Sequence, residues 1–201
     1  MSRLWIAGSR SFSAEVLGFA RDARMEVVGL LEPRDRLKVG HTVHGQPVSW
    51  LDEAEAEEGD SAIVGTGDPD RVEVTERLVA RGFSLATVVH PAAHVPPTAR
   101  VGAGSIVAPG VVLGEEAVLG DHVVVGRGSL VGHHTVVGDF ATLGPGSNVA
   151  GNVRIEAGAF LGMAAVVRDH VSIGESAVVA MGAVVVGDVA AGAQVRGLPA
   201  R

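Results

Sequence analysis

Two adjacent histidines, His133 and His134, are the residues of this chain best suited to moving a proton. They lie in residues 131–151, which read VGHHTVVGDFATLGPGSNVAG. Imidazole takes up and releases a proton near neutral pH, so such a side chain can serve as a general acid or base. The chain contains no cysteine, which excludes a thiol nucleophile and a thiolate metal site. The alternative is that both histidines are exposed turn residues with no catalytic role.

The histidines lie within a repeat of six residues. Every sixth residue from Val89 to Val185 is Val, Leu or Ile, and Ala191 is the exception among the eighteen positions of this series. The residue four places after each position is always Ala, Ser, Thr or Val, and glycine directly follows ten of the eighteen. Short strands joined by tight turns satisfy this period, whereas a helix does not. The repeat predicts a parallel β-solenoid, in which residues 89–196 form six triangular coils of 18 residues.

The first 88 residues follow a different pattern. The segments RLWIA, MEVVGLL and SAIVGT read as short strands, and residues 13–24 and 71–81 read as helices. Strands that alternate with helices favour a small three-layer domain around a parallel sheet. The sequence therefore predicts two domains, residues 1–88 and residues 89–201.

The composition argues against several classes of partner. The net charge is −7 and the pI is about 5.6, so bulk attraction to nucleic acid is not expected. No apolar run reaches the roughly 18 residues that span a bilayer, and the N-terminal MSRLWIAGSRSF does not have the form of a signal peptide. We therefore expect a cytoplasmic protein with neither a nucleic-acid nor a membrane partner.

The chain resembles the hexapeptide-repeat acyltransferases. The resemblance is greater to bacterial sialic acid O-acetyltransferases and to nucleotide-amino-sugar N-acetyltransferases, including the enzyme of the UDP-bacillosamine pathway. It is carried by the junction VVHPAAHVPPTA, the region GHHTVVGDFATLGPGSNVAGNV and the ending VRGLPAR. It implies an α/β Rossmann-like N-terminal domain followed by a left-handed parallel β-helix, assembly as a homotrimer, and acetyl-CoA as co-substrate.

The resemblance implies that His133 is the general base, which takes a proton from an acceptor amine or hydroxyl. Residues 18 apart stack on neighbouring coils separated by about 4.8 Å, so Gly151 is expected next to His133. The resemblance assigns to the Gly151 N–H the oxyanion that forms when the acceptor attacks the thioester. We thus expect proton transfer and oxyanion binding at one corner of the solenoid.

The group that orients His133 departs from the family. Many relatives carry an acidic residue next to the catalytic histidine, but here the neighbours are Gly132 and His134. We predict that Asp139 orients His133, with Glu115 on the preceding coil or a backbone carbonyl as the alternatives.

A nucleotide-sugar site is expected where the predicted parallel strands end. The turn GSRSFS matches G-x-G-x-x-G only at Gly8. Arg10 and the N–H groups at a helix start suit a phosphate, and the resemblance implies a UDP- or GDP-sugar. The expected contacts are Gly8, Ser9, Arg10, Ser11, Glu32, Gly65 and Thr66. The alternative is a degenerate loop that binds no nucleotide.

For acetyl-CoA, the resemblance implies a groove between neighbouring subunits, closed by the tail GLPAR. Small residues that leave room for the pantetheine arm are the candidates. They are Gly151, Gly162, Ala180, Gly197 and Pro199.

The implied function is transfer of an acetyl group from acetyl-CoA to the amine of a nucleotide-linked amino sugar in surface-glycan biosynthesis. One alternative is a sugar O-acyltransferase or the use of another acyl group, and a second is a non-enzymatic solenoid that binds a nucleotide sugar. A zinc enzyme is the third, because the spacing of His134, His170 and Glu175 is similar to that in γ-class carbonic anhydrases, although Glu175 is no histidine. We expect no metal.

Overall fold

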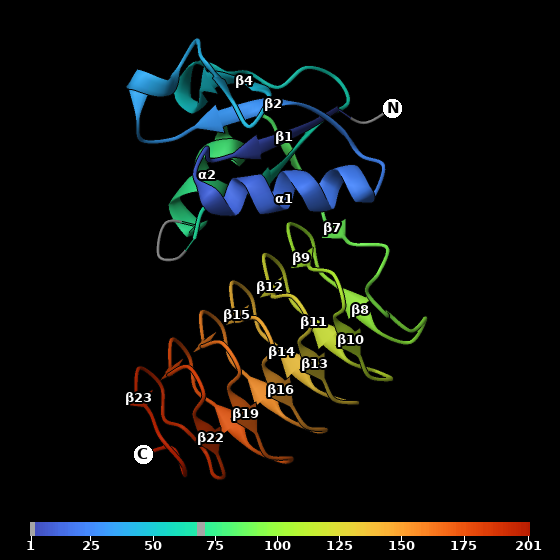
Figure 1. The fold of residues 1–201 in the computed structure, drawn as a ribbon, viewed down its shortest axis with the longest axis vertical. Coiled ribbons are helices and arrows are strands. Elements are labelled where there is room, and N and C mark those ends of the chain that lie inside the picture. The colour runs from blue at the N-terminus through green and yellow to red at the C-terminus, as the bar shows by residue number, and fades with distance from the viewer. Residues whose placement is uncertain (1–2, 68–70) are drawn as a thin grey trace. The chain divides into compact units, whose positions relative to one another are not determined.

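The computed structural model describes residues 3–67 and 71–201 (Figure 1). The chain divides into two compact units, Met1–Val88 and Val89–Arg201. Among the helices described, none has both the length and the apolar character needed to cross a bilayer.

Among its described residues, the first unit contains one six-stranded sheet and two α-helices. In sheet order the strands are β3 (Thr42–Val43), β4 (Gln46–Trp50), β2 (Glu26–Glu32), β1 (Arg3–Ala7), β5 (Asp60–Val64) and β6 (Ser84–Leu85). The helices are α1 (Ser11–Asp22) and α2 (Arg71–Ala80). The predicted strands β1, β2 and β5 are present and pair in parallel.

The sheet is mixed, whereas the sequence predicted a parallel one. Strand β3 pairs antiparallel with β4 through a two-residue turn at His44 and Gly45, which have φ of 51° and 74°. Positive φ at both central residues gives the turn the twist that hairpin strands need. This edge hairpin was missed, and the prediction of a purely parallel sheet was wrong.

The two helices cover opposite faces of the sheet. Ala7 belongs to a buried cluster with Val74 and Leu78 of α2. Ile6 lies on the other side, where a Cβ built on Gly65 would meet both Ile6 and Ser13 of α1. Because successive strand residues point to opposite faces, the unit has three layers, as predicted (Figure 1).

The second unit is a parallel β-solenoid, as predicted, with three sheets of two-residue strands. One sheet contains β10 (Val112–Leu113), β13 (Leu130–Val131), β16 (Asn148–Val149), β19 (Val166–Val167) and β22 (Val184–Val185). The next contains β8 (Arg100–Val101), β11 (Val118–Leu119), β14 (Val136–Val137), β17 (Arg154–Ile155) and β20 (Ser172–Ile173). The third contains β7 (Val88–Val89), β9 (Ile106–Val107), β12 (Val124–Val125), β15 (Thr142–Leu143), β18 (Phe160–Leu161), β21 (Val178–Val179) and β23 (Gln194–Val195).

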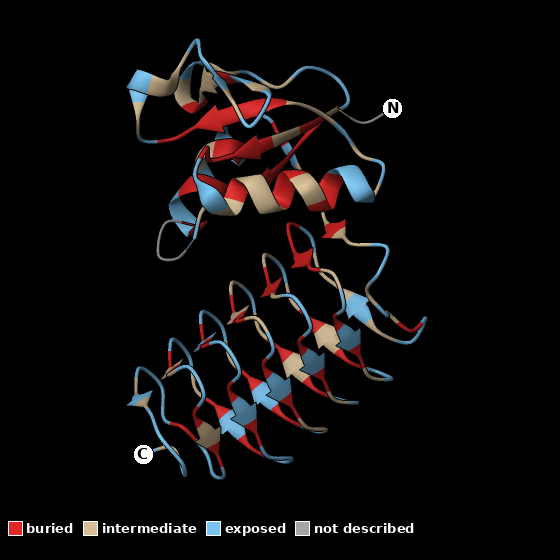
Figure 2. Cartoon of the chain, viewed as in Figure 1, coloured by how far each residue is buried: buried red, intermediate tan, exposed pale blue. Residues whose placement is uncertain are grey.

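The 18-residue period sets which side chains are neighbours. Leu113, Val131 and Val149 are paired from coil to coil, and each is at most 2% exposed. The small residue four places later is buried as well, as at Thr135, whose hydroxyl donates to the Ala150 carbonyl at 2.9 Å. Figure 2 shows that these buried positions recur along the solenoid. The core is therefore made of two stacked rows per corner, one aliphatic and one small.

Glycines that follow the aliphatic positions allow neighbouring coils to approach closely. A Cβ on Gly132 would lie 2.4 Å from the Gly151 nitrogen. Two residues after these glycine positions, the backbone adopts the left-handed conformation. Every sixth residue from Gly104 to Gly182 has positive φ. His134 occupies one of these positions, with φ of 57°. Asn, Asp and His adopt this conformation more readily than most residues other than glycine.

The six-residue register ends after Val185. Ile173 pairs with Val189 and Val179 pairs with Val195, so partners in the last coil are 16 residues apart. Ala191 therefore lies outside the inward row, and it is exposed. The predicted register was wrong here because this coil is two residues shorter than the others.

We predict that Gly138→Ala lowers the free energy of unfolding by about 1–3 kcal/mol, the usual cost of overpacking. The new Cβ would lie 2.6 Å from the Ala157 nitrogen on the next coil. The matched control is Gly187→Ala, where nothing lies within 4 Å and φ is not positive. That change should stay within about 0.5 kcal/mol of the parent chain in denaturant unfolding. Equal stability of the two variants would contradict close packing between coils.

Candidate functional site

His133 and His134 lie on an exposed turn between β13 and β14. The buried side chains of Val131 and Thr135 anchor the turn on either side. His134 N donates to the Glu115 carbonyl at 2.9 Å, which ties the turn to the preceding coil. Both imidazoles therefore project from a rigid backbone into open space, where a substrate can reach them.

The two imidazoles contact each other and a carboxylate. The Nδ1 atoms of His133 and His134 are 3.0 Å apart, and the ring planes cross at 87°. His134 Nε2 lies 3.3 Å from a carboxylate oxygen of Glu116, which belongs to the preceding coil. The corner thus holds a chain of three polar side chains that ends at a negative charge.

Gly151 lies next to His133, as the 18-residue period predicted. A Cβ on Gly151 would be 2.6 Å from His133 Nε2 and 2.7 Å from its Cε1. Only glycine leaves room for the imidazole in this position. The adjacency is confirmed, whereas the role of the Gly151 N–H in binding an oxyanion stays a prediction.

The predicted orienting carboxylates have other partners. Asp139 Oδ1 accepts from the Asp121 N–H at 2.8 Å on the preceding coil. Glu115 accepts from the Thr98 hydroxyl. The role predicted for Asp139 therefore has no contact to support it, and the group that does contact His133 is its sequence neighbour His134.

A separate cavity of about 230 Å³ lies in the first unit. It is lined by Gly8, Ser9, Arg10, Phe12, Glu32, Pro33, Arg34, Gly65, Thr66 and Gly67. Six of the seven predicted nucleotide-sugar contacts are among these residues, and Ser11 is not. The strands β1, β2 and β5 are parallel neighbours, so their carboxyl ends bring these residues together.

Two glycines keep the floor of this cavity thin. Gly8 has φ of 120°, and a Cβ on it would lie 3.0 Å from the Thr66 side chain. A Cβ on Gly65 would lie 2.7 Å from Ile6. Arg10 is the N-cap of α1, and its side chain accepts no hydrogen bond from the first N–H groups of the helix. The cavity therefore offers backbone donors and a guanidinium, which suit an anion.

Glu32 is buried at the edge of the cavity, and its carboxylate has partners within the chain. It accepts from the Ser9 hydroxyl and from the N–H groups of Arg34 and Asp35, at 2.9 and 3.0 Å. Lys38 Nζ lies 3.2 Å from the Ser9 hydroxyl. The predicted contact of Glu32 with a ribose or base stays a prediction. Lys38 was missed, although it is the single lysine of the sequence.

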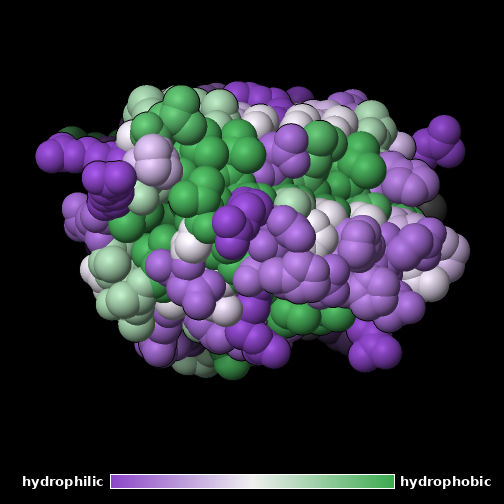
Figure 3. Space-filling view, turned by 90° about the horizontal axis from the view of Figure 1, so that it is seen from below, coloured by the Kyte–Doolittle hydropathy of each residue, from purple (hydrophilic) through white to green (hydrophobic). Residues whose placement is uncertain are grey.

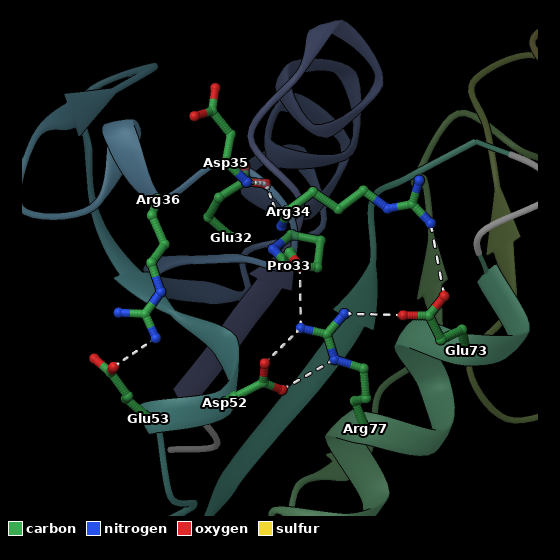
Figure 4. A network of polar contacts seen from close by, with 9 residues as sticks. All are labelled: Glu32, Pro33, Arg34, Asp35, Arg36, Asp52, Glu53, Glu73 and Arg77. Atoms are coloured by element: carbon green, nitrogen blue, oxygen red, sulfur yellow. Dashed lines mark hydrogen bonds and ion pairs between the residues drawn. The ribbon is translucent and has the colours of Figure 1, made fainter.

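The loop that follows β2 is held in place from α2. Arg77 donates to both carboxylate oxygens of Asp52, at 3.0 and 2.9 Å (Figure 4). It also donates to the Pro33 carbonyl at 3.0 Å and to Glu73 at 3.2 Å. Pro33 lines the cavity, so this network fixes one of its walls.

A second cavity, of about 540 Å³, lies at the end of the solenoid. It is lined by Val178, Ala180, Gln194, Val195, Arg196 and Arg201. Ala180 was predicted to contact acetyl-CoA, and the two arginines were not. Guanidinium groups bind phosphate well, so the cavity has the polar groups that a phosphorylated ligand needs.

The other predicted acetyl-CoA contacts do not line this cavity. Gly162 is buried between coils, where a Cβ would lie 2.5 Å from the Met181 nitrogen. Gly197 has φ of 92°, and its carbonyl accepts from the Val184 N–H at 3.0 Å. Pro199 is exposed in the tail that follows. Their contacts with acetyl-CoA stay predictions.

The spacing that raised the zinc alternative does not assemble a metal site. Across residues 3–67 and 71–201, no three His, Asp or Glu side chains are grouped so that they could hold a metal ion. His134 lies next to Glu116, and His170 Nε2 lies 3.8 Å from its neighbour Asp169.

Comparison with known proteins gives similar solved structures. No protein-family model and no curated protein sequence matches the chain. PerB from Caulobacter crescentus, solved with CoA and GDP-perosamine, is 30% identical with a TM-score of 0.91, covering 100% of this chain and 97% of that one. Two further structures of this perosamine N-acetyltransferase carry one histidine replaced by asparagine or by alanine.

Two other solved structures cover nearly the whole chain. The acetyltransferase domain of PglB from Neisseria gonorrhoeae FA1090, solved with acetyl coenzyme A, is 30% identical with a TM-score of 0.89, covering 100% of this chain and 98% of that one. WeeI from Acinetobacter baumannii is 26% identical with a TM-score of 0.90, covering 98% of each chain. The likeness extends over both units.

Proposed function

Because the chain belongs to the hexapeptide-repeat nucleotide-amino-sugar N-acetyltransferases, we propose that it transfers an acetyl group from acetyl-CoA to the amine of a nucleotide-linked amino sugar in surface-glycan biosynthesis. The observation that carries the proposal is the exposed His133, with its Nε2 edge against Gly151 and its Nδ1 held by His134. This places a base nitrogen beside a residue that has no side chain.

The mechanism needs no covalent enzyme intermediate. His133 Nε2 takes a proton from the acceptor amine while the amine nitrogen attacks the thioester carbonyl. The Gly151 N–H binds the oxyanion of the tetrahedral intermediate. The intermediate collapses, the carbon–sulfur bond breaks, and CoA leaves as the thiolate or takes the proton from His133. A direct transfer agrees with the absence of cysteine from the sequence.

The cavity in the first unit is the proposed nucleotide-sugar site. Arg10 and the N–H groups at the start of α1 would hold the diphosphate, and the thin floor at Gly8 and Gly65 lets the ligand approach the backbone. The Caulobacter relative, solved with GDP-perosamine and CoA, supports an acceptor of this class. We infer from the order of β2, β1 and β5 that the first unit is a Rossmann-like variant. Similarity to the solved N-acetyltransferases supports a left-handed solenoid. We also propose a cytoplasmic location.

We predict that Arg10→Glu raises the KM for the nucleotide sugar and leaves the KM for acetyl-CoA nearly unchanged. The added carboxylate would repel the diphosphate at the cavity. Steady-state kinetics with each substrate varied in turn measures both constants. Arg24→Glu, just beyond the far end of α1, is the control and should alter neither constant. Equal effects of Arg10→Glu on both substrates, or no effect, would remove this loop from the site.

We predict that His133→Ala lowers kcat by about 10²–10⁴-fold, the usual contribution of a general base. Thermal stability and acetyl-CoA affinity should stay nearly unchanged, because the buried Val131 and Thr135 still anchor the turn. Release of thiol from acetyl-CoA with a panel of nucleotide amino sugars gives the rate. A panel that also contains sugars with a hydroxyl in place of the amine separates N- from O-acylation. If His134→Ala were the more damaging change, or neither mattered, His133 would not be the base.

The proposed assembly is a homotrimer. On one sheet of the solenoid, Val112, Leu130 and Val166 are 40–43% exposed at outward positions in the same row. The space-filling view from below shows exposed hydrophobic side chains gathered in patches among polar ones (Figure 3). Asn148 lies between Leu130 and Val166 in this row, and the apolar side chains on either side of it remain exposed. Exposed apolar surface of this kind is typical of protein–protein interfaces.

We predict that light scattering gives a mass three times that of the 20.5 kDa chain at micromolar concentration. Leu130→Glu should weaken the assembly, because it places a carboxylate in the apolar row. Ser172→Glu, at an exposed outward position of another sheet, is the control. A stable monomer of the parent chain would contradict the trimer.

A further inference from the structure

The hydrogen bond between His133 and His134 restricts where their protons lie. Two Nδ1 atoms at 3.0 Å form a hydrogen bond only when one carries a proton and the other does not. His134 Nε2 faces the Glu116 carboxylate at 3.3 Å, and an ionised carboxylate only accepts. In a neutral His134 the proton is therefore on Nε2, and its Nδ1 is the acceptor. It follows that His133 carries its proton on Nδ1 and has a bare Nε2.

The bare nitrogen is the one that the reaction needs. His133 Nε2 is the ring atom closest to the space above Gly151, where a Cβ would lie 2.6 Å away. His133 Nδ1 faces the opposite way, toward His134. The three side chains thus direct the lone pair of the base toward the glycine whose N–H is proposed to bind the oxyanion.

We propose that His134 and Glu116 are positioning residues, which hold His133 in the tautomer with Nε2 free to accept a proton. The proposal rests on the function proposed above for His133. His134 takes the place of the acidic neighbour that the family resemblance led us to expect, and Glu116 supplies the carboxylate from the preceding coil.

The fold fixes the positions of His134 and Glu116, which together with His133 form a relay of three side chains. His134 and Glu116 occupy the same left-handed turn position on successive coils, with φ of 57° and 59°, so their side chains lie side by side. The Glu116 N–H donates to the Thr98 hydroxyl at 3.1 Å, and the same hydroxyl donates to Glu115. Glu115 is thereby held by Thr98, and Glu116 remains to face His134.

His134 faces the Glu116 carboxylate on the preceding coil, and the equivalent turn position of the following coil carries an uncharged side chain. The next coil presents Asn152 at the equivalent position, with φ of 57°. When His133 takes a proton at Nε2, its Nδ1–H still donates to His134, and the Glu116 carboxylate faces the resulting positive charge through that ring. All three side chains are exposed, so we expect a modest contribution to the rate rather than an essential one.

Substitutions at His134 separate the hydrogen bond from the turn. His134→Ala removes the acceptor but keeps the backbone, because Ala164 adopts the same conformation in this chain with φ of 56°. We expect kcat to fall by about 2–10-fold, the range of one net hydrogen bond, with both KM values unchanged. His134→Asn retains an oxygen acceptor for His133 Nδ1 and should restore kcat to within about 2-fold of the parent.

The tautomer itself is measured by ¹⁵N NMR of histidine-labelled protein, at about pH 8.5, where an ordinary imidazole is neutral. In the parent chain the His133 signals should show a protonated Nδ1 and a bare Nε2. In His134→Ala this preference should be lost, and in His134→Asn it should persist. A merely structural role for His134 would leave the His133 tautomer unchanged.

Matched controls test the specificity of the relay. His170→Asn alters the histidine at the same turn position two coils on, and Glu115→Gln removes the carboxylate next to Glu116. Neither should change kcat or the tautomer of His133. In the His134→Asn background, Glu116→Gln should have no further effect, because the link between the two residues is already broken.

The outcomes distinguish this proposal from the proposed function. If His133→Ala retains full kcat, the assignment of the base fails, whatever the NMR spectra show. If His133→Ala is inactive but His134→Ala changes neither kcat nor the His133 tautomer, the relay is overturned and the proposed function stands.

Discussion

The backbone pairing between coils 18 residues apart is the constraint on which the second unit depends. Backbone hydrogen bonds join neighbouring coils in both directions: the Gly114 N–H donates to Val131 on the next coil, and the His134 N–H donates to Glu115 on the preceding one. A residue therefore has two sets of neighbours, along the chain and across the coils. Inward positions then admit only aliphatic and small side chains, and the glycines that follow many of the aliphatic positions allow the coils to approach closely. The same pairing places His133 against Gly151 and His134 beside Glu116.

In the first unit the equivalent constraint is the parallel alignment of β2, β1 and β5. Their carboxyl ends lie at one edge, so residues far apart in sequence, such as Gly8, Glu32 and Gly65, line a common cavity. Burial of the Glu32 carboxylate is stabilised by three donors from the chain itself, and Arg77 ties the adjoining loop to α2. Within this unit, charged groups near the cavity therefore stabilise the loop that follows β2, in addition to any contact with a ligand.

The sequence predicted the features that its six-residue period determines, namely the solenoid and the neighbours of each residue on adjacent coils. A row of aliphatic residues at every sixth position is typical of a parallel β-solenoid. The 18-residue coil then predicts that Gly151 lies next to His133. Features that depend on side-chain direction were not accessible in this way. Asp139 has the right residue type, but its carboxylate caps the Asp121 N–H instead of reaching the histidine. Deletion of two residues in the last coil changes its register without any break in apolar character, so Val189 and Ala191 could not be told apart by type.

The exterior of a solenoid tolerates changes that its interior does not, and this accounts for the departure from the family at position 134. An outward side chain at a turn has little packing to preserve, so an acid can be replaced by histidine without cost to the core. In the proposed arrangement the function of that acid passes to the Glu116 carboxylate, which the 18-residue period places beside His134 on the preceding coil. A catalytic histidine in such a fold can thus be oriented from a neighbouring coil as readily as from a neighbouring residue. A search for its partner should therefore follow the period of the solenoid as well as the sequence.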